Sequence, residues 1–170
     1  MLTYLLSNYS KSKLGTCICL GKFDGVHAGH QKLLAEVTKL AGIHNLDSLA
    51  ICLYPNPKIF NNPKLTIKTL TNIPTRVKKI YQLGINYVDV IKFDKVLSEL
   101  TAQEFVDYLL SFYNLRIWVV SSNITFGKDA EGNLAWLQAY SKLKKFEVIV
   151  FGYITNSNGD ILSSTLLRGV

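Results

Sequence analysis

Short apolar runs alternate with amphipathic runs along the whole chain, and this alternation constrains the fold more than any other feature. Five runs have the near-continuous hydrophobicity of buried strands: 16–21, 48–54, 86–93, 116–120 and 146–155. Between them, four runs with apolar residues at helical spacing predict helices: 30–41, 75–83, 101–112 and 134–143. Such alternation is typical of an open, mostly parallel α/β sheet of Rossmann-like type, with helices on both faces.

The size and composition predict one globular domain over residues 1–170. The sequence shows no internal repeat and no second domain, and 48% of its residues are hydrophobic while 18% are charged. Its apolar stretches are too short to cross a bilayer, and its N-terminus lacks the basic start and cleavage site of a signal peptide. We therefore expect a cytoplasmic protein that is not associated with a membrane.

The net charge of +7 predicts an anionic partner, either a phosphate-bearing small molecule or a nucleic acid. The lysines are scattered, which favours a solvated basic face over a nucleic-acid interface. Cys17, Cys19 and Cys52 lie inside apolar runs and form no C-x-x-C pair. We expect them to be buried thiols in a reducing compartment.

The stretch "LGKFDGVHAGHQKLL" at 20–34 joins the first predicted strand to the first predicted helix. It lacks the G-x-G-x-x-G fingerprint, and the residue after Lys22 is Phe23, so it is not a P-loop. Metal coordination by His27 and His30 is disfavoured because no further histidine or cysteine ligand stands nearby.

Two alternatives remain for these histidines: capping and packing of the helix, or anion binding. Gly25 and Gly29 allow the backbone to approach a ligand closely. A helix that starts near His30 presents unpaired N–H groups, to which the two imidazoles would add donors. We favour phosphate binding because two histidines flank a glycine at a strand-to-helix turn.

The other feature at the predicted strand ends is a long connection. All four prolines fall between Pro55 and Pro74, which predicts a long irregular segment, either a functional loop or a surface linker. Gly21, Pro55 and Ser121 each follow a predicted strand. Ligands of open α/β sheets bind outside the carboxyl ends of the strands, so we expect the site there.

The motif H-A-G-H at 27–30 resembles the H-x-G-H signature of the nucleotidyltransferase superfamily. A longer ordered set of segments is similar to the adenylyltransferase module of bacterial bifunctional riboflavin kinase/FAD synthetases: "LGKFDGVHAGHQKLL", "YPNPKIF", "KLT", "LGINYVDVIKFD", "TAQEFVDYLL", "VVSSNITFGKDAEGNL" and "SSTLLR". The likeness covers nearly the whole chain, and "NITFGK" and "SSTLLR" are its most specific parts.

This resemblance implies an FMN adenylyltransferase, which transfers AMP from ATP to FMN and releases pyrophosphate. Mg²⁺ would be bound with ATP, and no metal ligand is assigned in the protein. The nucleophile is already an anionic phosphate, so catalysis reduces to alignment and charge neutralisation. ATP and FMN are the expected partners, and no partner protein is indicated.

The resemblance also implies residue roles. The catalytic residues would be His27, His30 and Arg168. ATP would be bound by Gly21, Phe23, His27, Gly29, His30, Ser164, Thr165 and Arg168. FMN would be bound by Pro55, Asn56, Phe60, Lys64, Asn123 and Phe126. Without the resemblance, "SST" at 163–165 predicts a helix N-cap and Arg168 a solvated terminal residue, whereas core packing is the alternative for Phe60 and Phe126. Asp24 would orient a histidine or form the turn.

Some positions depart from the family pattern. Ser121 stands where the family usually has glycine, and Ile124 replaces an aromatic residue. The family protein usually continues into a riboflavin kinase module, and we expect that module to be absent here. These departures keep open a degenerate flavin or nucleotide binder. A nucleotidyltransferase of the same superfamily with another phosphorylated acceptor is a second alternative.

Overall fold

The computed structural model describes residues 2–62, 64, 71–155 and 161–168, and its centre is a seven-stranded sheet in the order β1-β4-β3-β2-β5-β6-β7. Five neighbouring strands are parallel: β4 (Tyr87–Lys92), β3 (Asp47–Tyr54), β2 (Thr16–Gly21), β5 (Leu115–Ser121) and β6 (Glu147–Thr155). Two antiparallel strands form the edges: β1 (Tyr4–Ser7) and β7 (Ile161–Arg168). The predicted open, mostly parallel sheet is therefore confirmed.

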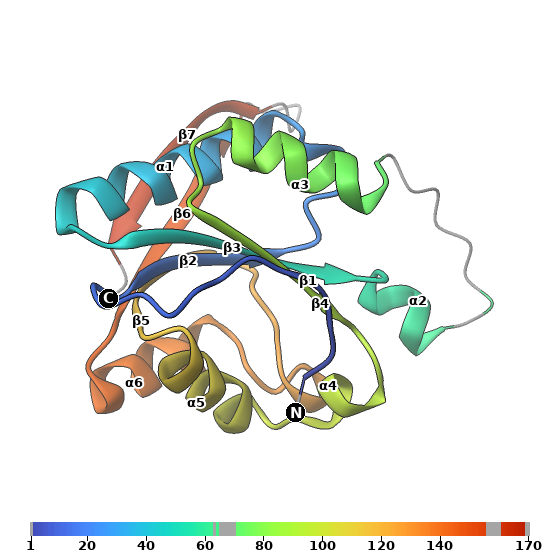
Figure 1. The fold of residues 1–170 in the computed structure, drawn as a ribbon. Coiled ribbons are helices and arrows are strands. Elements are labelled where there is room, and N and C mark those ends of the chain that lie inside the picture. The colour runs from blue at the N-terminus through green and yellow to red at the C-terminus, as the bar shows by residue number, and fades with distance from the viewer. Residues whose placement is uncertain (1, 63, 65–70, 156–160, 169–170) are drawn as a thin grey trace.

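Helices cover both faces of this sheet (Figure 1). On one face lie α1 (Ala28–His44) and α3 (Ile73–Gln82), and on the other lie α5 (Ala102–Phe112) and α6 (Leu134–Lys144). Each face has its own cluster of buried side chains, one with Leu34 and Ile80 and the other with Leu109 and Leu137. Four short elements complete the described fold: the helical turns η1 (Asp24–Val26) and η2 (Lys128–Ala130), and the helices α2 (Pro57–Asn61) and α4 (Lys95–Glu99).

Several local predictions are confirmed. The helix expected over 101–112 is confirmed as α5, at whose start Thr101 and Glu104 form both hydrogen bonds of a capping box. Cys17, Cys19 and Cys52 are buried with free thiols, and burial raises the pKa of Cys17 and Cys52 to about 12. No helix in the described ranges is long and apolar enough to span a bilayer.

Other local predictions are wrong. The two edge strands were not expected, and the N-cap alternative for 163–165 fails because these residues lie inside β7. The connection after Pro55 is not wholly irregular, since α2 begins at Pro57. Helix α1 begins two residues before the expected position, because His27 caps it. Each of these elements depends on tertiary pairing or on a single cap, and hydrophobic periodicity reports neither.

The strand register defines the edge at which a ligand would bind. Gly21 at the end of β2 pairs with Cys52, two residues before the end of β3. Ser121 at the end of β5 pairs with Phe151 of β6. The turn after β2, the segment after β3 and the loop after β5 therefore leave the sheet at the same edge, as expected for a parallel α/β sheet.

Candidate active site

The turn between β2 and α1 has an unusual backbone. Phe23, Gly25 and Val26 have φ values of 53°, 77° and 43°, which all lie in the left-handed region. Phe23 is only 1% exposed, and a Cβ on Gly21 would meet its ring at 3.3 Å. The buried Phe23 ring therefore packs against the turn, and the missing side chain of Gly21 leaves room for this ring. Their predicted contact with ATP stays a prediction.

The two histidines of this turn lie against each other. Their rings are stacked with centroids 3.6 Å apart and an interplanar angle of 21°. His27 is the N-cap of α1, and its Nδ1 accepts a hydrogen bond of 3.2 Å from the backbone N–H of Gly29. Because Nδ1 is an acceptor, neutral His27 carries its proton on Nε2, which is then a donor for an anion. Capping and anion binding are therefore compatible for this residue.

His30 lies in a less polar environment than His27. Its ring packs edge-on against Phe23, and its Nδ1 is buried without a hydrogen-bond partner among the described residues. Burial is the main cause that lowers the pKa of His30 to about 4, and the neighbouring His27 and Arg76 add to the shift. His30 is therefore neutral near pH 7 and can donate only one N–H, and a bound phosphate would raise its pKa again.

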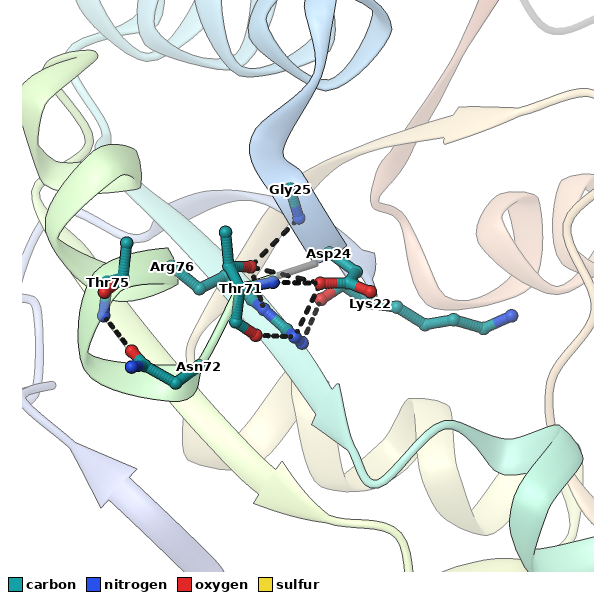
Figure 2. Close-up of polar contacts among 7 residues, drawn as sticks. All are labelled: Lys22, Asp24, Gly25, Thr71, Asn72, Thr75 and Arg76. Atoms are coloured by element: carbon teal, nitrogen blue, oxygen red, sulfur yellow. Dashed lines mark hydrogen bonds and ion pairs between the residues drawn. The ribbon is translucent and has the colours of Figure 1, made fainter. Parts of the chain in front are cut away.

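A buried arginine anchors the turn, and the sequence analysis missed it. Arg76 on α3 is 2% exposed and forms an ion pair of 3.1 Å with Asp24. Its guanidinium also donates to the backbone oxygens of Lys22, at 2.9 Å, and Thr71, at 2.8 Å (Figure 2). The Asp24 carboxylate in turn accepts from the N–H and hydroxyl of Thr71.

Asp24 therefore holds the turn through Arg76 and Thr71, which supports the turn alternative of the two considered from the sequence. The Thr71 hydroxyl also accepts from the backbone N–H of Gly25, so Thr71 and Arg76 hold the left-handed segment from outside. Only the apolar spacing of α3 was visible in the sequence. A partner 52 residues away in the chain gives no local signal.

A pocket opens beside this turn at the carboxyl ends of β2 and β3. Its lining includes two residues predicted to bind FMN, Pro55 and Asn56; the other lining residues are Lys22, Asp24, Leu53, Tyr54, Ile59 and Arg76. Phe60 is not in this lining; it is 37% exposed and packs edge-on against Phe93. Lys64 is exposed. The structure thus brings part of the predicted FMN set next to the predicted ATP-binding turn.

The two remaining FMN candidates, Asn123 and Phe126, lie in the loop after β5 and differ in their exposure to solvent. Asn123 is exposed, and its side-chain oxygen accepts a hydrogen bond of 2.8 Å from the Ser121 hydroxyl. Phe126 is 8% exposed and packs against Phe105, Trp118 and Trp136. This burial favours the core-packing alternative for Phe126, whereas Asn123 remains accessible to a ligand.

The C-terminal candidates are placed only by their backbone. Thr165 and Ser164 pair with Gly152 and Tyr153 of β6, just beyond the residue that pairs with Ser121, so their backbone lies at the ligand edge of the sheet. Arg168 pairs with Ile149, further from that edge. The side chains of these three residues lie outside the described part of the structure, and their roles stay predictions.

Within the described ranges, no group of three or more histidine, cysteine, aspartate or glutamate side chains could hold a metal ion. The Asp24 carboxylate is engaged by Arg76 and Thr71.

Comparison with known proteins identifies relatives. Curated bifunctional riboflavin kinase/FMN adenylyltransferases are similar to this chain: that of Buchnera aphidicola subsp. Schizaphis graminum is 31% identical over 164 residues, covering 96% of this chain and 53% of that protein. That of Listeria monocytogenes is 30% identical over 154 residues, covering 90% of this chain and 49% of the other. The chain thus spans about half the length of the curated relatives it matches.

A solved structure also resembles this fold. The crystal structure of a protein described as a macrolide-efflux protein, from Streptococcus pneumoniae, has a TM-score of 0.76 and 27% identity, covering 88% of this chain and 48% of that one. The family model described as FAD synthetase matches residues 9–166, which is most of the sequence. The chain therefore belongs to the FAD synthetase family.

Proposed function

We propose that this chain catalyses adenylyl transfer from ATP to FMN, and so forms FAD and pyrophosphate. A phosphate oxygen of FMN attacks the α-phosphorus of ATP, and the bond from that phosphorus to the β-phosphate bridge breaks. Family membership, the names of the curated relatives and the H-x-G-H turn support this proposal. The observation that carries it is the pair of stacked imidazoles in a turn whose Lys22 and Asp24 line a pocket at the strand ends.

The turn supports the reaction by binding anions in fixed positions. His27 offers Nε2–H, and α1, with 17 residues, presents the positive end of its dipole at the same place. His30 is neutral before substrate binds. Its hydrogen bond to a phosphate would strengthen as negative charge builds up on that phosphate. No side-chain nucleophile is required, because the acceptor phosphate is itself the nucleophile.

Mg²⁺ is part of the proposal as a companion of ATP. When bound there, it would neutralise phosphate charge and orient the leaving pyrophosphate. By analogy with the family, Ser164, Thr165 and Arg168 bind the triphosphate from β7.

The test is a chromatographic assay of the whole chain, 1–170, with FMN, ATP and Mg²⁺, in which FAD and pyrophosphate are both followed. Riboflavin serves as a parallel acceptor. Equal amounts of FAD and pyrophosphate from FMN would support the proposal. Binding of FMN and ATP without pyrophosphate release would instead indicate a degenerate binder, and turnover with another phosphorylated acceptor would indicate a different nucleotidyltransferase. No residue described in this site favours macrolide efflux, the activity for which the similar solved protein is named.

A further inference from the structure

One lysine lines the pocket, and a second lies in α2 between the lining residues Asn56 and Ile59. Lys22 follows β2 and lines the pocket together with Pro55 and Asn56. Its side chain extends away from Arg76 and the Asp24 carboxylate (Figure 2). Within the described part of the chain, the Lys22 ammonium has no ion pair.

The second lysine comes from the segment that follows β3. Lys58 lies in α2, where Asn56 caps its backbone N–H at 3.0 Å. Partial burial lowers the pKa of Lys22, and the positive charge of Lys58 nearby lowers it further. Two neighbouring like charges, one of them partly desolvated, are unfavourable unless an anion joins them.

The charges around the pocket leave a local excess of positive charge. Asp24 is the acidic residue of the lining, and Arg76 offsets its charge in a direct ion pair. His30 is neutral at pH 7 because its pKa is about 4. Lys22 and Lys58 therefore leave a local excess of positive charge beside residues that the family resemblance assigns to flavin. A phosphate monoester with close to two negative charges complements this excess.

We propose that Lys22 and Lys58 bind the phosphate group of the acceptor, and that Lys22 makes the site select a phosphorylated flavin over an unphosphorylated one. This inference rests on the proposed function. Lys22 is not among the FMN-binding residues that the family resemblance implies. The lysine also holds the attacking phosphate next to the histidine turn, because its own carbonyl is tied to the turn by Arg76.

The experiment measures binding without turnover. The whole chain is titrated with FMN and with riboflavin, following flavin fluorescence, and with ATP by calorimetry. The variants are Lys22→Gln, Lys22→Arg and Lys58→Gln. Lys142→Gln is the matched control, because Lys142 is an exposed residue of α6 near the end of the helix that precedes β6 and carries the same charge.

We expect Lys22→Gln to raise the FMN dissociation constant about tenfold, because a charge-assisted hydrogen bond to phosphate is lost. The riboflavin dissociation constant should stay within about twofold of the wild-type value, and Lys22→Arg should restore most of the FMN affinity. Lys58→Gln should cost about threefold, because Lys58 is exposed. Lys142→Gln should change none of these constants.

Three outcomes would overturn the inference. They are a wild-type chain that binds riboflavin as tightly as FMN, equal losses of FMN and riboflavin in Lys22→Gln, and a loss confined to ATP, which would place Lys22 on the triphosphate. A wild-type chain that prefers FMN through Lys22 yet releases no pyrophosphate would uphold the inference and refute the proposed catalysis. The two proposals therefore fail separately.

Discussion

Replacing Arg76 with methionine tests whether this buried arginine holds the turn between β2 and α1. The change removes an ion pair to Asp24 and the hydrogen bonds to Lys22 and Thr71, while it keeps most of the apolar volume. The loss should exceed that of an ordinary surface charge, because the arginine side chain is 3% exposed and leaves a carboxylate behind.

The magnitude follows from the burial of the two partners. Removing one partner of a buried pair costs about 3–5 kcal/mol. Asp24 retains 28% side-chain exposure and the two hydrogen bonds from Thr71, so its desolvation is incomplete. We therefore expect Arg76→Met to lower the free energy of unfolding by about 3 kcal/mol, at the low end of that range.

The assay is urea unfolding of the whole chain, with equal slopes required for the comparison. Lys95→Met is the matched control: it removes the same charge from a pair with Glu99 at 4.0 Å in which the side chains are 82% and 58% exposed. This control should cost less than about 0.5 kcal/mol. If Arg76→Met destabilises the chain by no more than Lys95→Met, the ion pair does not hold the turn and the reasoning is refuted.

The remaining predictions concern the site and two glycines. His30→Ala should abolish most FAD formation while FMN binding survives; unchanged turnover would exclude its phosphate role. Lys64→Ala should weaken FMN binding more than ATP binding, and equal weakening in titrations would remove it from the flavin site. The pKa of His30 falls from an ordinary 6.5 to about 4, so the unfolded chain binds more protons between these values and stability should fall as pH drops through this window. Urea unfolding at pH 7 and pH 5 should show a smaller loss in His30→Gln than in the wild type. Gly127→Ala should destabilise the fold by about 1–3 kcal/mol, because φ is +78° and the new Cβ would meet the backbone of Ala102 at 2.7 Å. Gly42→Ala, inside α1 with open space around it, should instead stabilise by up to about 1 kcal/mol in the same assay.

The sequence predicted the elements whose pattern is local and long. The five central strands are buried on both faces, so their apolar runs were visible without knowledge of their partners. Strand β1 has only four residues, and β7 has a polar centre, so both needed their neighbours β4 and β6 to become recognisable. The helices α2 and α4 have five residues each, which is too short for a helical period to show.

The candidate site divides in the same way. The H-x-G-H turn is contiguous, so its glycines and histidines could be interpreted from spacing alone. The contacts that support it are not contiguous: Thr71 and Arg76 reach the turn from a segment about 50 residues further along the chain. Phe126 lies in a contiguous motif, but the motif does not reveal the burial of this residue, which packs against three other rings.

The geometry of the turn links these two levels. Three left-handed residues are costly for an isolated segment, and two of them, Phe23 and Val26, carry side chains that oppose this conformation. The burial of both side chains and the Arg76 contacts offset that cost, which places the two imidazoles in one stack beside the pocket. The geometry of the turn that carries both histidines therefore depends on a tertiary ion pair. A variant that breaks the ion pair should weaken phosphate binding even though every histidine and lysine of the motif is still present.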